Sequence, residues 1–253
     1  MAFSFGLQGK TALVTGASSG LGEHFARVLA AEGVAVALAA RSVDKLEALK
    51  AEIEGRGGKA YCVRMDVKDV KSIRAAVDEI EAKFAPIEVL VNNSGISTTV
   101  YVTDVEEKDY DDTLDTNARG AFFVAQAVAR KMIAAQRTGR IINIASAIGL
   151  RSLSLLSTYG MSKAAVLRMT QTMALEWLRY NITVNAICPG YILTGINRDY
   201  FASPGGQKLM NRLPRKRVGP PESLDGILLL LASDRSEYIN GAIIPVDDGT
   251  VIS

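Results

Sequence analysis

The sequence predicts an α/β protein built on one doubly wound parallel sheet. Short β-rich apolar runs alternate with longer amphipathic runs along the 253 residues, an order typical of a parallel sheet covered by helices. The predicted strands are apolar throughout rather than at every second position, which indicates burial on both faces. No repeat, low-complexity linker or change of composition divides the chain, so we expect a single domain over residues 1–253.

The apolar runs place the strands, and the amphipathic runs place the helices between them. We expect strands at Thr11–Val14, Val34–Ala40, Ala60–Met65, Glu88–Val91, Arg140–Ala145, Thr183–Ile187 and Ile243–Val246. We expect helices near Leu21–Glu32, Val43–Gly55, Val70–Phe84, Ala118–Gln136, Thr158–Tyr180 and Glu222–Ser233. Because the connections are short, the crossovers should be right-handed, with helices on both faces of the sheet.

Two segments depart from this alternation. The stretch from Thr194 to Pro221 has no clear strand and contains several prolines and glycines. A long irregular insertion in a compact α/β domain is more often a functional lid than a neutral loop, so we expect a substrate lid at about 194–221. The helix Ala118–Gln136 is apolar around more than one face, which predicts packing on both sides, and its second partner could be another subunit.

The composition excludes several classes of function. With 29 basic and 27 acidic residues, the net charge of +2 is too weak to hold nucleic acid or an anionic membrane. A single histidine, His24, and two distant cysteines predict no metal site and no Ser-His-Asp hydrolase. No apolar run approaches the ~20 residues that span a bilayer. Met1–Lys10 is unlike a signal peptide, so we expect a cytoplasmic protein.

A glycine-rich turn follows the first strand directly and leads into the first helix. Glycines let a backbone turn sharply and approach a pyrophosphate closely, while the helix presents free N–H groups and its positive end to the anion. The strand–turn–helix context therefore predicts a dinucleotide phosphate site, against the alternative of a tight turn without a ligand. Its residues are Gly16, Ser18, Ser19, Gly20, Leu21 and Gly22.

The ends of the second and third strands indicate which dinucleotide is bound. In such folds an acidic residue after the second strand holds a ribose 2′-hydroxyl, whereas an arginine accommodates a 2′-phosphate. Arg41, with Ser42 as a second donor, therefore favours NADP(H) and leaves NAD(H) possible, unless Arg41 is only a solvated residue that begins a loop. Asp66, followed by Val67, is placed to accept a hydrogen bond from an adenine amino group, unless it caps a helix.

Three side chains, none of them a histidine, form a candidate catalytic group. Tyr159 and Lys163 lie four residues apart near the start of a predicted helix, so both side chains share one face. Ser146 lies at the end of the preceding apolar strand. The carboxyl ends of strands are where an open α/β sheet binds its ligands, so these side chains are expected to meet there.

The motifs, taken together and in order, resemble those of the short-chain dehydrogenase/reductase family over almost the whole chain. They are TGASSGLG at residues 15–22, Asn92-Asn93-Ser94-Gly95, Asn117, Ser146, Tyr159 with Lys163, and Pro189-Gly190. The resemblance implies a Rossmann sheet of seven strands and a nicotinamide coenzyme. It also implies a catalytic tetrad of Asn117, Ser146, Tyr159 and Lys163.

The resemblance implies further roles and shows two departures. It assigns Lys163 also to the nicotinamide ribose, and it gives Asn117 a water in a proton relay. It adds coenzyme contacts at Asn93, Gly95, Pro189, Gly190, Ile192 and Thr194. Such proteins usually form tetramers through the long helices that begin near Asn117 and Thr158. Ser94 stands where the family more often has alanine, and Asp247-Asp248-Gly249 replaces a glycine pair, which concerns the local turn and subunit contacts.

These residues predict an NADP(H)-preferring oxidoreductase of ketones and secondary alcohols. Tyrosine, with an ordinary pKa of ~10, yields little phenolate at neutral pH. The Lys163 ammonium and an oxidised nicotinamide are expected to lower the pKa of Tyr159, making it the general acid and base. Ser146 would hold the substrate oxygen as a preorganised donor.

The substrate is indicated only by class. Tyr159 and Ser146 should meet its oxygen, while Ile148, Tyr191 and other mostly apolar neighbours suggest a medium-sized apolar ketone or secondary alcohol. The basic cluster Arg212, Arg215, Lys216 and Arg217 allows an acyl carrier protein or coenzyme A as an acidic carrier, hence a 3-oxoacyl reductase, although a solvated basic turn is the simpler interpretation. An alternative function is that of a dinucleotide-binding sensor without catalysis. Such a protein is expected to lack one of the four tetrad residues, and all four are present in this sequence.

Overall fold

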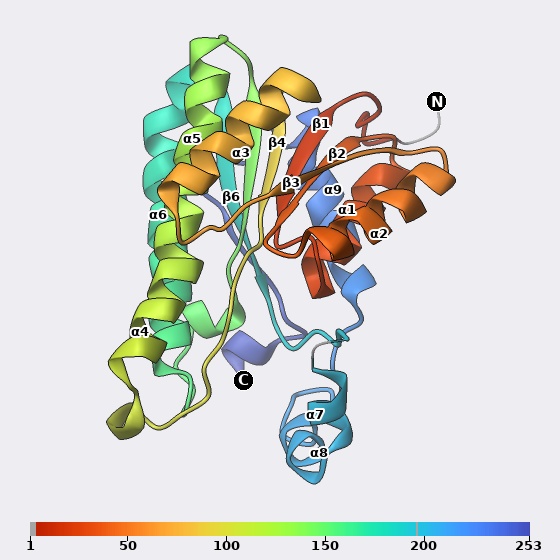
Figure 1. Ribbon diagram of the computed structural model, residues 1–253. Coiled ribbons are helices and arrows are strands. Elements are labelled where there is room, and N and C mark those ends of the chain that lie inside the picture. Colours follow the sequence, from red (N-terminus) through yellow and green to blue (C-terminus); the bar gives the residue numbers. More distant parts are fainter. Residues whose placement is uncertain (1–3, 196) are drawn as a thin grey trace.

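The computed structural model describes residues 4–195 and 197–253, which form one parallel sheet of seven strands between two layers of helices (Figure 1). The strands lie in the order β3-β2-β1-β4-β5-β6-β7. They span β1 Thr11–Thr15, β2 Ala35–Ala40, β3 Lys59–Arg64, β4 Val89–Asn92, β5 Gly139–Ile144, β6 Ile182–Pro189 and β7 Ile243–Val246. The predicted fold class is confirmed, and each expected strand is present within a few residues of its predicted bounds.

The longer helices cover both faces of this sheet, as the apolar strands predict. They are α1 Gly20–Ala31, α2 Val43–Gly55, α3 Val70–Lys83, α5 Ala121–Ala134, α6 Ser157–Trp177 and α9 Asp225–Ala232, whereas α4 Glu107–Leu114 packs on α6. Phe25, Leu46 and Leu228 belong to the core between the sheet and α1, α2 and α9. On the other face, Val128 and Met173 belong to the core beneath α3, α5 and α6.

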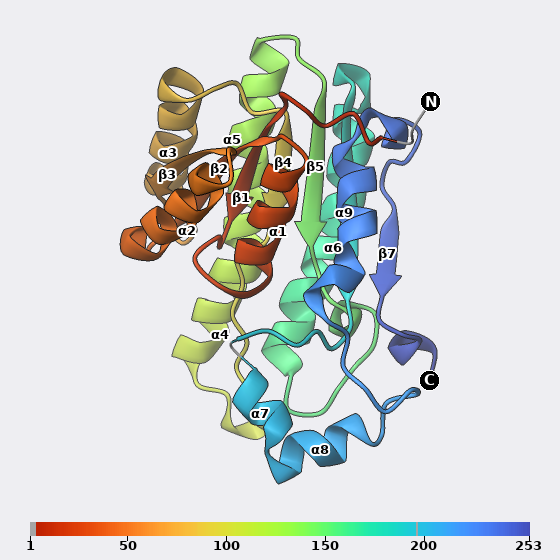
Figure 2. The ribbon, with the colours of Figure 1, turned by 90° about the vertical axis from the view of Figure 1, so that its right-hand side faces the viewer.

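The carboxyl ends of the strands all face one end of the molecule. The arrowheads of β5 and β7 point toward α7 (Arg198–Ala202), α8 (Pro204–Met210) and the C-terminal residues (Figure 2). The chain passes from β1 outward to β2 and β3 and then returns to β4 on the other side of β1. This reversal of strand order opens a crevice in which doubly wound proteins bind ligands.

The helix expected at Ala118–Gln136 begins earlier than predicted. A π-helical segment, Asp115–Gly120, joins α4 to α5, so helical backbone runs from residue 107 to residue 134. The prediction missed α4 because its sequence, EKDYDDTL, is largely charged and has no apolar stripe that would mark a buried face.

The stretch expected to be irregular, at about 194–221, contains two short helices, so the prediction is wrong for α7 and α8. Ser203 starts α8 by accepting a hydrogen bond from the Gly206 backbone N–H at 3.2 Å, and Pro204 occupies the first helical turn. Such short helices depend on capping rather than on a long apolar period, so the apolar pattern of the sequence does not predict them. Position 196 of this stretch lies outside the described residues.

Candidate active site

The glycine-rich turn after β1 has the backbone that a phosphate site requires. Gly16 and Gly20 adopt φ angles of +67° and +59°, in the left-handed region that favours glycine. A Cβ atom on Gly22 would lie 2.2 Å from the Gly16 carbonyl oxygen, so only glycine fits there. Ser19 precedes α1 in extended conformation, and its side chain makes no capping hydrogen bond. The first N–H groups of α1 and the Ser19 hydroxyl can therefore bind an anion.

Thr15 and Asn93 tie this turn to the end of β4. The Thr15 hydroxyl oxygen accepts hydrogen bonds from the backbone N–H groups of Asn93 at 2.9 Å and Ser94 at 3.1 Å. The Asn93 side-chain amide donates to the Thr15 carbonyl at 3.1 Å. Thr15 was not among the predicted site residues, although its place at the start of TGASSGLG could have signalled it.

The residues expected at the adenosine end of the coenzyme lie beyond β2 and β3. Arg41 and Ser42 are exposed, and Arg41 has no ion-pair partner among the described residues. The Asp66 carboxylate accepts a hydrogen bond from the backbone N–H of Lys68 at 3.0 Å. The alternative in which Asp66 caps a helix is wrong, because Asp69 is the N-cap of α3. Val67 is buried, and a Cβ on Gly120 would lie 2.7 Å from its carbonyl oxygen.

Asn117, Ser146, Tyr159 and Lys163 come together at the carboxyl end of β5. Lys163 donates from Nζ to the Ile144 carbonyl at 2.8 Å, and the same Nζ lies 5.8 Å from the centre of the Tyr159 ring. The Ser146 hydroxyl lies close enough to the Tyr159 hydroxyl to act on its pKa, which it lowers. A Cβ on Gly95 would lie 3.3 Å from Asn117 Oδ1 and 3.4 Å from Lys163 Nζ, so both groups lie on the side of Gly95 where a side chain would be.

Asn117 is held by a reciprocal pair of hydrogen bonds. Its amide Nδ2 donates to the Ile96 carbonyl at 2.8 Å, and its Oδ1 accepts from the Ile96 backbone N–H at 2.8 Å. The amide also donates to Ser162 Oγ at 2.9 Å, and Ser162 in turn donates to the Tyr159 carbonyl at 2.7 Å. Asn117 lies inside the π-helical segment, so its side chain does not cap a helix. Ser162 is a positioning residue that the sequence analysis missed, although its place within Tyr-Gly-Met-Ser-Lys could have signalled it.

Burial dominates the electrostatics of the site in the protein alone. Burial raises the pKa of Tyr159, and the hydrogen bond from Ser146 opposes this only in part. Burial lowers the pKa of Lys163 to about 8. The expected lowering of the Tyr159 pKa by Lys163 is therefore wrong for the protein alone, because loss of water around both groups disfavours their charged forms. Burial likewise raises the pKa of the neighbouring Cys188 thiol to about 11.

Lys163 should make the folded protein gain stability as the pH rises above 8. Its pKa is about 8 when folded and 10.5 ordinarily, so between these values the unfolded chain keeps a proton that the folded chain has released. Stability then rises with pH, by at most about 1.4 kcal/mol per pH unit from this group. Urea unfolding at pH 8.0 and about 9.5 should show a larger gain for the wild type than for Lys163→Met. Equal gains in the two proteins would contradict this assignment.

The segment expected to meet the nicotinamide follows β6. Pro189 is buried, and Gly190 donates its N–H to the Val246 carbonyl at 3.0 Å. A Cβ on Gly190 would lie 2.7 Å from the Asp247 Cα atom, so this strand end packs closely against β7. Asn197 accepts a hydrogen bond from the Thr194 backbone N–H at 2.8 Å and donates one to the Ile192 carbonyl at 2.8 Å.

The two remaining substrate candidates lie near the lid and after Ser146. The Tyr191 ring contacts Phe201 of α7 edge to face, with ring centres 6.1 Å apart. Burial raises the pKa of Tyr191. Ile148 is half-buried and donates its backbone N–H to Ser146 Oγ at 3.1 Å. This bond orients the Ser146 hydroxyl while leaving its proton free to be donated.

Two general properties of the described residues bear on the site. None of their helices is long and apolar enough to cross a membrane. No group of three or more His, Cys, Asp or Glu side chains among them could hold a metal ion.

Comparison with known proteins gives the same family throughout. A family model described as short chain dehydrogenase matches residues 10–204. The chain is 37% identical to a 3-oxoacyl-(acyl-carrier-protein) reductase of Thermotoga maritima, over 97% of this chain and 99% of that protein. It is 36% identical to a 2-dehydro-3-deoxy-D-gluconate 5-dehydrogenase of Dickeya dadantii, over 97% of both chains. The crystal structure of a gluconate 5-dehydrogenase from Burkholderia cenocepacia, in complex with NADP and tartrate, superposes with a TM-score of 0.93 at 36% identity, covering 98% of both chains.

Proposed function

Because the chain belongs to the short-chain dehydrogenase family, we propose that it transfers hydride between NADP(H) and a ketone or secondary alcohol, with Tyr159 as the general acid and base. The single observation that carries this proposal is the meeting of Asn117, Ser146, Tyr159 and Lys163 beside the glycine-rich turn. The fold and the relatives establish the coarser statement, that the chain is an oxidoreductase of CH–OH and C=O groups.

The residues present fit a nicotinamide dinucleotide. Gly22 packs too closely against Gly16 for any side chain, which keeps the turn tight, and the free N–H groups of the turn residues 16–22 would hold the two phosphates. Arg41, Ser42 and Asp66 would hold the adenosine part, while Gly190, Ile192 and Thr194 would meet the nicotinamide. When bound, the coenzyme supplies or accepts the hydride.

The side chains of the chain itself handle the proton. In reduction, Tyr159 donates its hydroxyl proton to the substrate oxygen, and Ser146 donates a hydrogen bond to the same oxygen as negative charge develops there. Where Lys163 carries its proton, its charge lies beside the phenolate that remains on Tyr159, but in the protein alone burial outweighs this effect on the pKa of Tyr159. The raised pKa of Tyr159 keeps the hydroxyl protonated at neutral pH, which suits an acid in carbonyl reduction.

The coenzyme preference should be reversed by a substitution at one position. Arg41→Asp is expected to change the ratio of kcat/KM for NADPH over NADH by at least about tenfold, because a carboxylate repels the 2′-phosphate and accepts from a 2′-hydroxyl. The matched control is Arg74→Asp, which removes an exposed arginine of α3 outside the proposed coenzyme site. An unchanged ratio in Arg41→Asp would remove this residue from the proposal.

For the substrate, we propose a medium-sized ketone or secondary alcohol, because Ile148 and Tyr191 offer mostly apolar surface. A 3-oxoacyl thioester is the second candidate, favoured by the likeness to the Thermotoga maritima reductase. The basic cluster supports that candidate only weakly, since Arg215 and Arg217 are already paired with Asp248.

The experiment that tests the function is a coenzyme and carbonyl screen. The purified protein is incubated with NADPH or NADH and with cyclohexanone, acetoacetyl-coenzyme A or 5-ketogluconate, while absorbance of the reduced nicotinamide is followed. Turnover with cyclohexanone supports the apolar substrate, and turnover with acetoacetyl-coenzyme A supports the second candidate. Coenzyme binding without turnover of any carbonyl would instead indicate the non-catalytic sensor.

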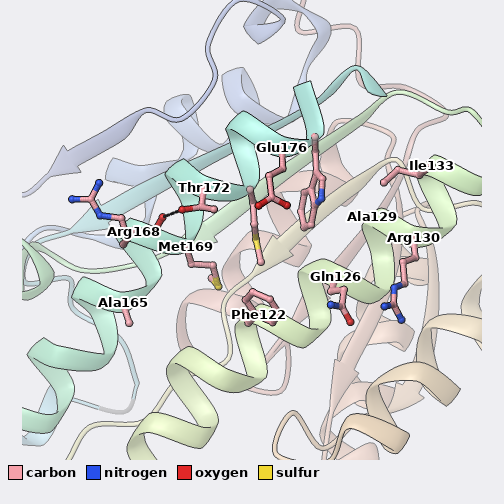
Figure 3. Close-up of a pocket in the computed structure, with 12 residues that line it drawn as sticks. Phe122, Gln126, Ala129, Arg130, Ile133, Ala165, Arg168, Met169, Thr172 and Glu176 are labelled. Carbon is pink, nitrogen blue, oxygen red and sulfur yellow. Dashed lines mark hydrogen bonds between the residues drawn. The ribbon is translucent and has the colours of Figure 1, made fainter. Parts of the chain in front are cut away.

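We also propose a cytoplasmic homotetramer. The two cysteines are free thiols, which suits a reducing compartment. Between α5 and α6 runs a groove of about 560 Å³, with Phe122 and Met169 on its walls (Figure 3). Phe122, Met161 and Leu175 are exposed on these helices and would be covered by a second copy. Light scattering at micromolar concentration tests this assembly.

A further inference from the structure

Two arginines at the end of the proposed lid bind one aspartate near the C-terminal end of the chain. Arg215 Nη1 lies 3.1 Å from Asp248 Oδ1, and Arg217 Nε lies 2.9 Å from Asp248 Oδ2, so both carboxylate oxygens are used. We propose that Asp248 is a positioning residue, which holds the lid against the C-terminal segment through this double ion pair and thereby sets the affinity for substrate. The proposal rests on the function proposed above.

The backbone on both sides of the ion pair is arranged to make it. Lys216, between the two arginines, has a φ of +50°, and Asp248 has a φ of +55°. Few residues other than glycine adopt such angles, and here they turn both guanidinium groups toward one carboxylate. Asp248 stands where the resemblance of the sequence predicts a glycine. The backbone conformation suited to glycine is thus kept, and a charged side chain has been added to it.

The double ion pair is the main polar attachment of the lid. The two ends of the lid are joined to each other, since Leu193 donates to the Gly219 carbonyl at 2.8 Å and Gly219 donates to the Tyr191 carbonyl at 2.8 Å. Between these ends, residues 198–218 make one backbone hydrogen bond to the base of the lid, from the Phe201 N–H to the Asn197 carbonyl at 3.1 Å. Among the described residues, their only hydrogen bonds and ion pairs to the chain outside the lid are those of Arg215 and Arg217 with Asp248. Without Asp248, the lid would be held by its base and by apolar contacts alone.

Asp248 also connects the lid to the catalytic loop. The neighbouring Asp247 carboxylate accepts hydrogen bonds from the backbone N–H groups of Gly249 at 3.1 Å and Val251 at 2.7 Å, which fixes the C-terminal turn. Arg151, five residues after Ser146, donates to the carbonyl of Thr250 in that turn. Tyr191, Arg217 and Asp248 line one cavity of about 190 Å³. The lid is thereby connected, through the C-terminal turn, to Arg151 in the loop after Ser146, and it shares a cavity with Tyr191.

The double ion pair between the lid and Asp248 is largely exposed to solvent, so it can hold the lid closed and still break when the lid opens. The side chains of Arg215, Arg217 and Asp248 are 62%, 55% and 34% exposed. Exposed ion pairs are weak and are screened by salt, so the lid can open in each turnover. The hydrogen bonds from Arg217 and Arg215 hold the pKa of Asp248 below its ordinary value, so the carboxylate is charged at neutral pH.

The test compares Asp248→Gly with Asp248→Asn. Glycine suits the φ of +55° and removes the whole side chain, while asparagine keeps the shape and removes the charge. For the panel carbonyl with the highest kcat/KM, both variants should raise KM about two- to fivefold and change kcat by less than about twofold. Raising NaCl from about 50 to 500 mM should raise KM for the wild type and leave the variants unchanged.

A second measurement does not depend on turnover. Limited trypsin digestion, followed by mass spectrometry, should cut after Arg215 and Arg217 several times faster in both variants than in the wild type. The matched control is Asp234→Asn, which removes a carboxylate that pairs with Lys10 and Arg140 away from the lid. Cleavage at the wild-type rate in Asp248→Gly would overturn the proposal even if no panel carbonyl turned over. Faster cleavage with unchanged KM would show that the ion pair does not set substrate affinity.

Discussion

Tyr159→Phe is expected to lower kcat/KM for carbonyl reduction by about 10²–10⁴-fold, while the affinity for NADPH changes by less than about twofold. Phenylalanine keeps the ring that lies 5.8 Å from Lys163 Nζ, but it has no proton to give to the substrate oxygen. The loss should fall mainly on kcat, because the proton is transferred in the transition state and not in the bound ground state. Steady-state rates and coenzyme fluorescence titration measure the two quantities.

The control for this substitution is Tyr180→Phe. Tyr180 follows α6 in the chain and packs against the core beneath α3, α5 and α6. Its loss of a hydroxyl should leave kcat/KM within about twofold. If Tyr159→Phe retained the turnover of the wild type, Tyr159 would not be the proton donor, and the proposed mechanism would have to be abandoned.

Gly22→Ala is expected to weaken NADPH binding by at least about tenfold and to lower the melting temperature. The new methyl carbon would lie 2.2 Å from the Gly16 carbonyl oxygen and 2.6 Å from the Asn93 side-chain nitrogen, so the turn has to move. Overpacking of this kind typically costs about 1–3 kcal/mol, and here the displaced atoms are those that would surround the pyrophosphate. Isothermal titration and thermal unfolding measure the two effects.

Gly226→Ala supplies the matched control. Gly226 lies in α9, and a Cβ atom there meets nothing within 4 Å. Alanine favours a helix over glycine by up to about 1 kcal/mol, so this variant should bind NADPH normally and melt no earlier than the wild type. Normal binding in Gly22→Ala as well would show that the turn does not hold the phosphates.

The sequence predicts the sheet well because its strands carry the strongest pattern in the chain. β1, β5 and β6 are buried at every position, and a mostly apolar run of that length is typical of a strand covered on both faces. The helices that were missed carry little such signal. α4 is charged along its length, while α7 and α8 are short and depend on Ser203 and Pro204 at one boundary.

The residues of the candidate site also differ in how well the sequence predicts them. Tyr159 and Lys163 share a helix face, so their meeting follows from spacing, whereas Ser162 and Thr15 act through hydrogen bonds to partners distant in the sequence. The spacing of residues in the sequence also cannot predict whether burial or a neighbouring charge determines a pKa. Lys163 was expected to acidify Tyr159, yet burial governs both groups because Lys163 is only 4% exposed.

The π-helical segment between α4 and α5 has a mechanical consequence. Its wider turn accommodates one residue more than an α-helix does, which rotates everything after it by about 100°. α4, before this segment, can therefore contact α6, while α5, after it, packs on β4 and β5. No proline kink is needed between the two helices. Deleting one residue here would yield a regular rod, but it would swing the amide of Asn117 away from Ile96. The π-helical segment thus interrupts the regular helix and, in doing so, orients the Asn117 side chain toward Ile96.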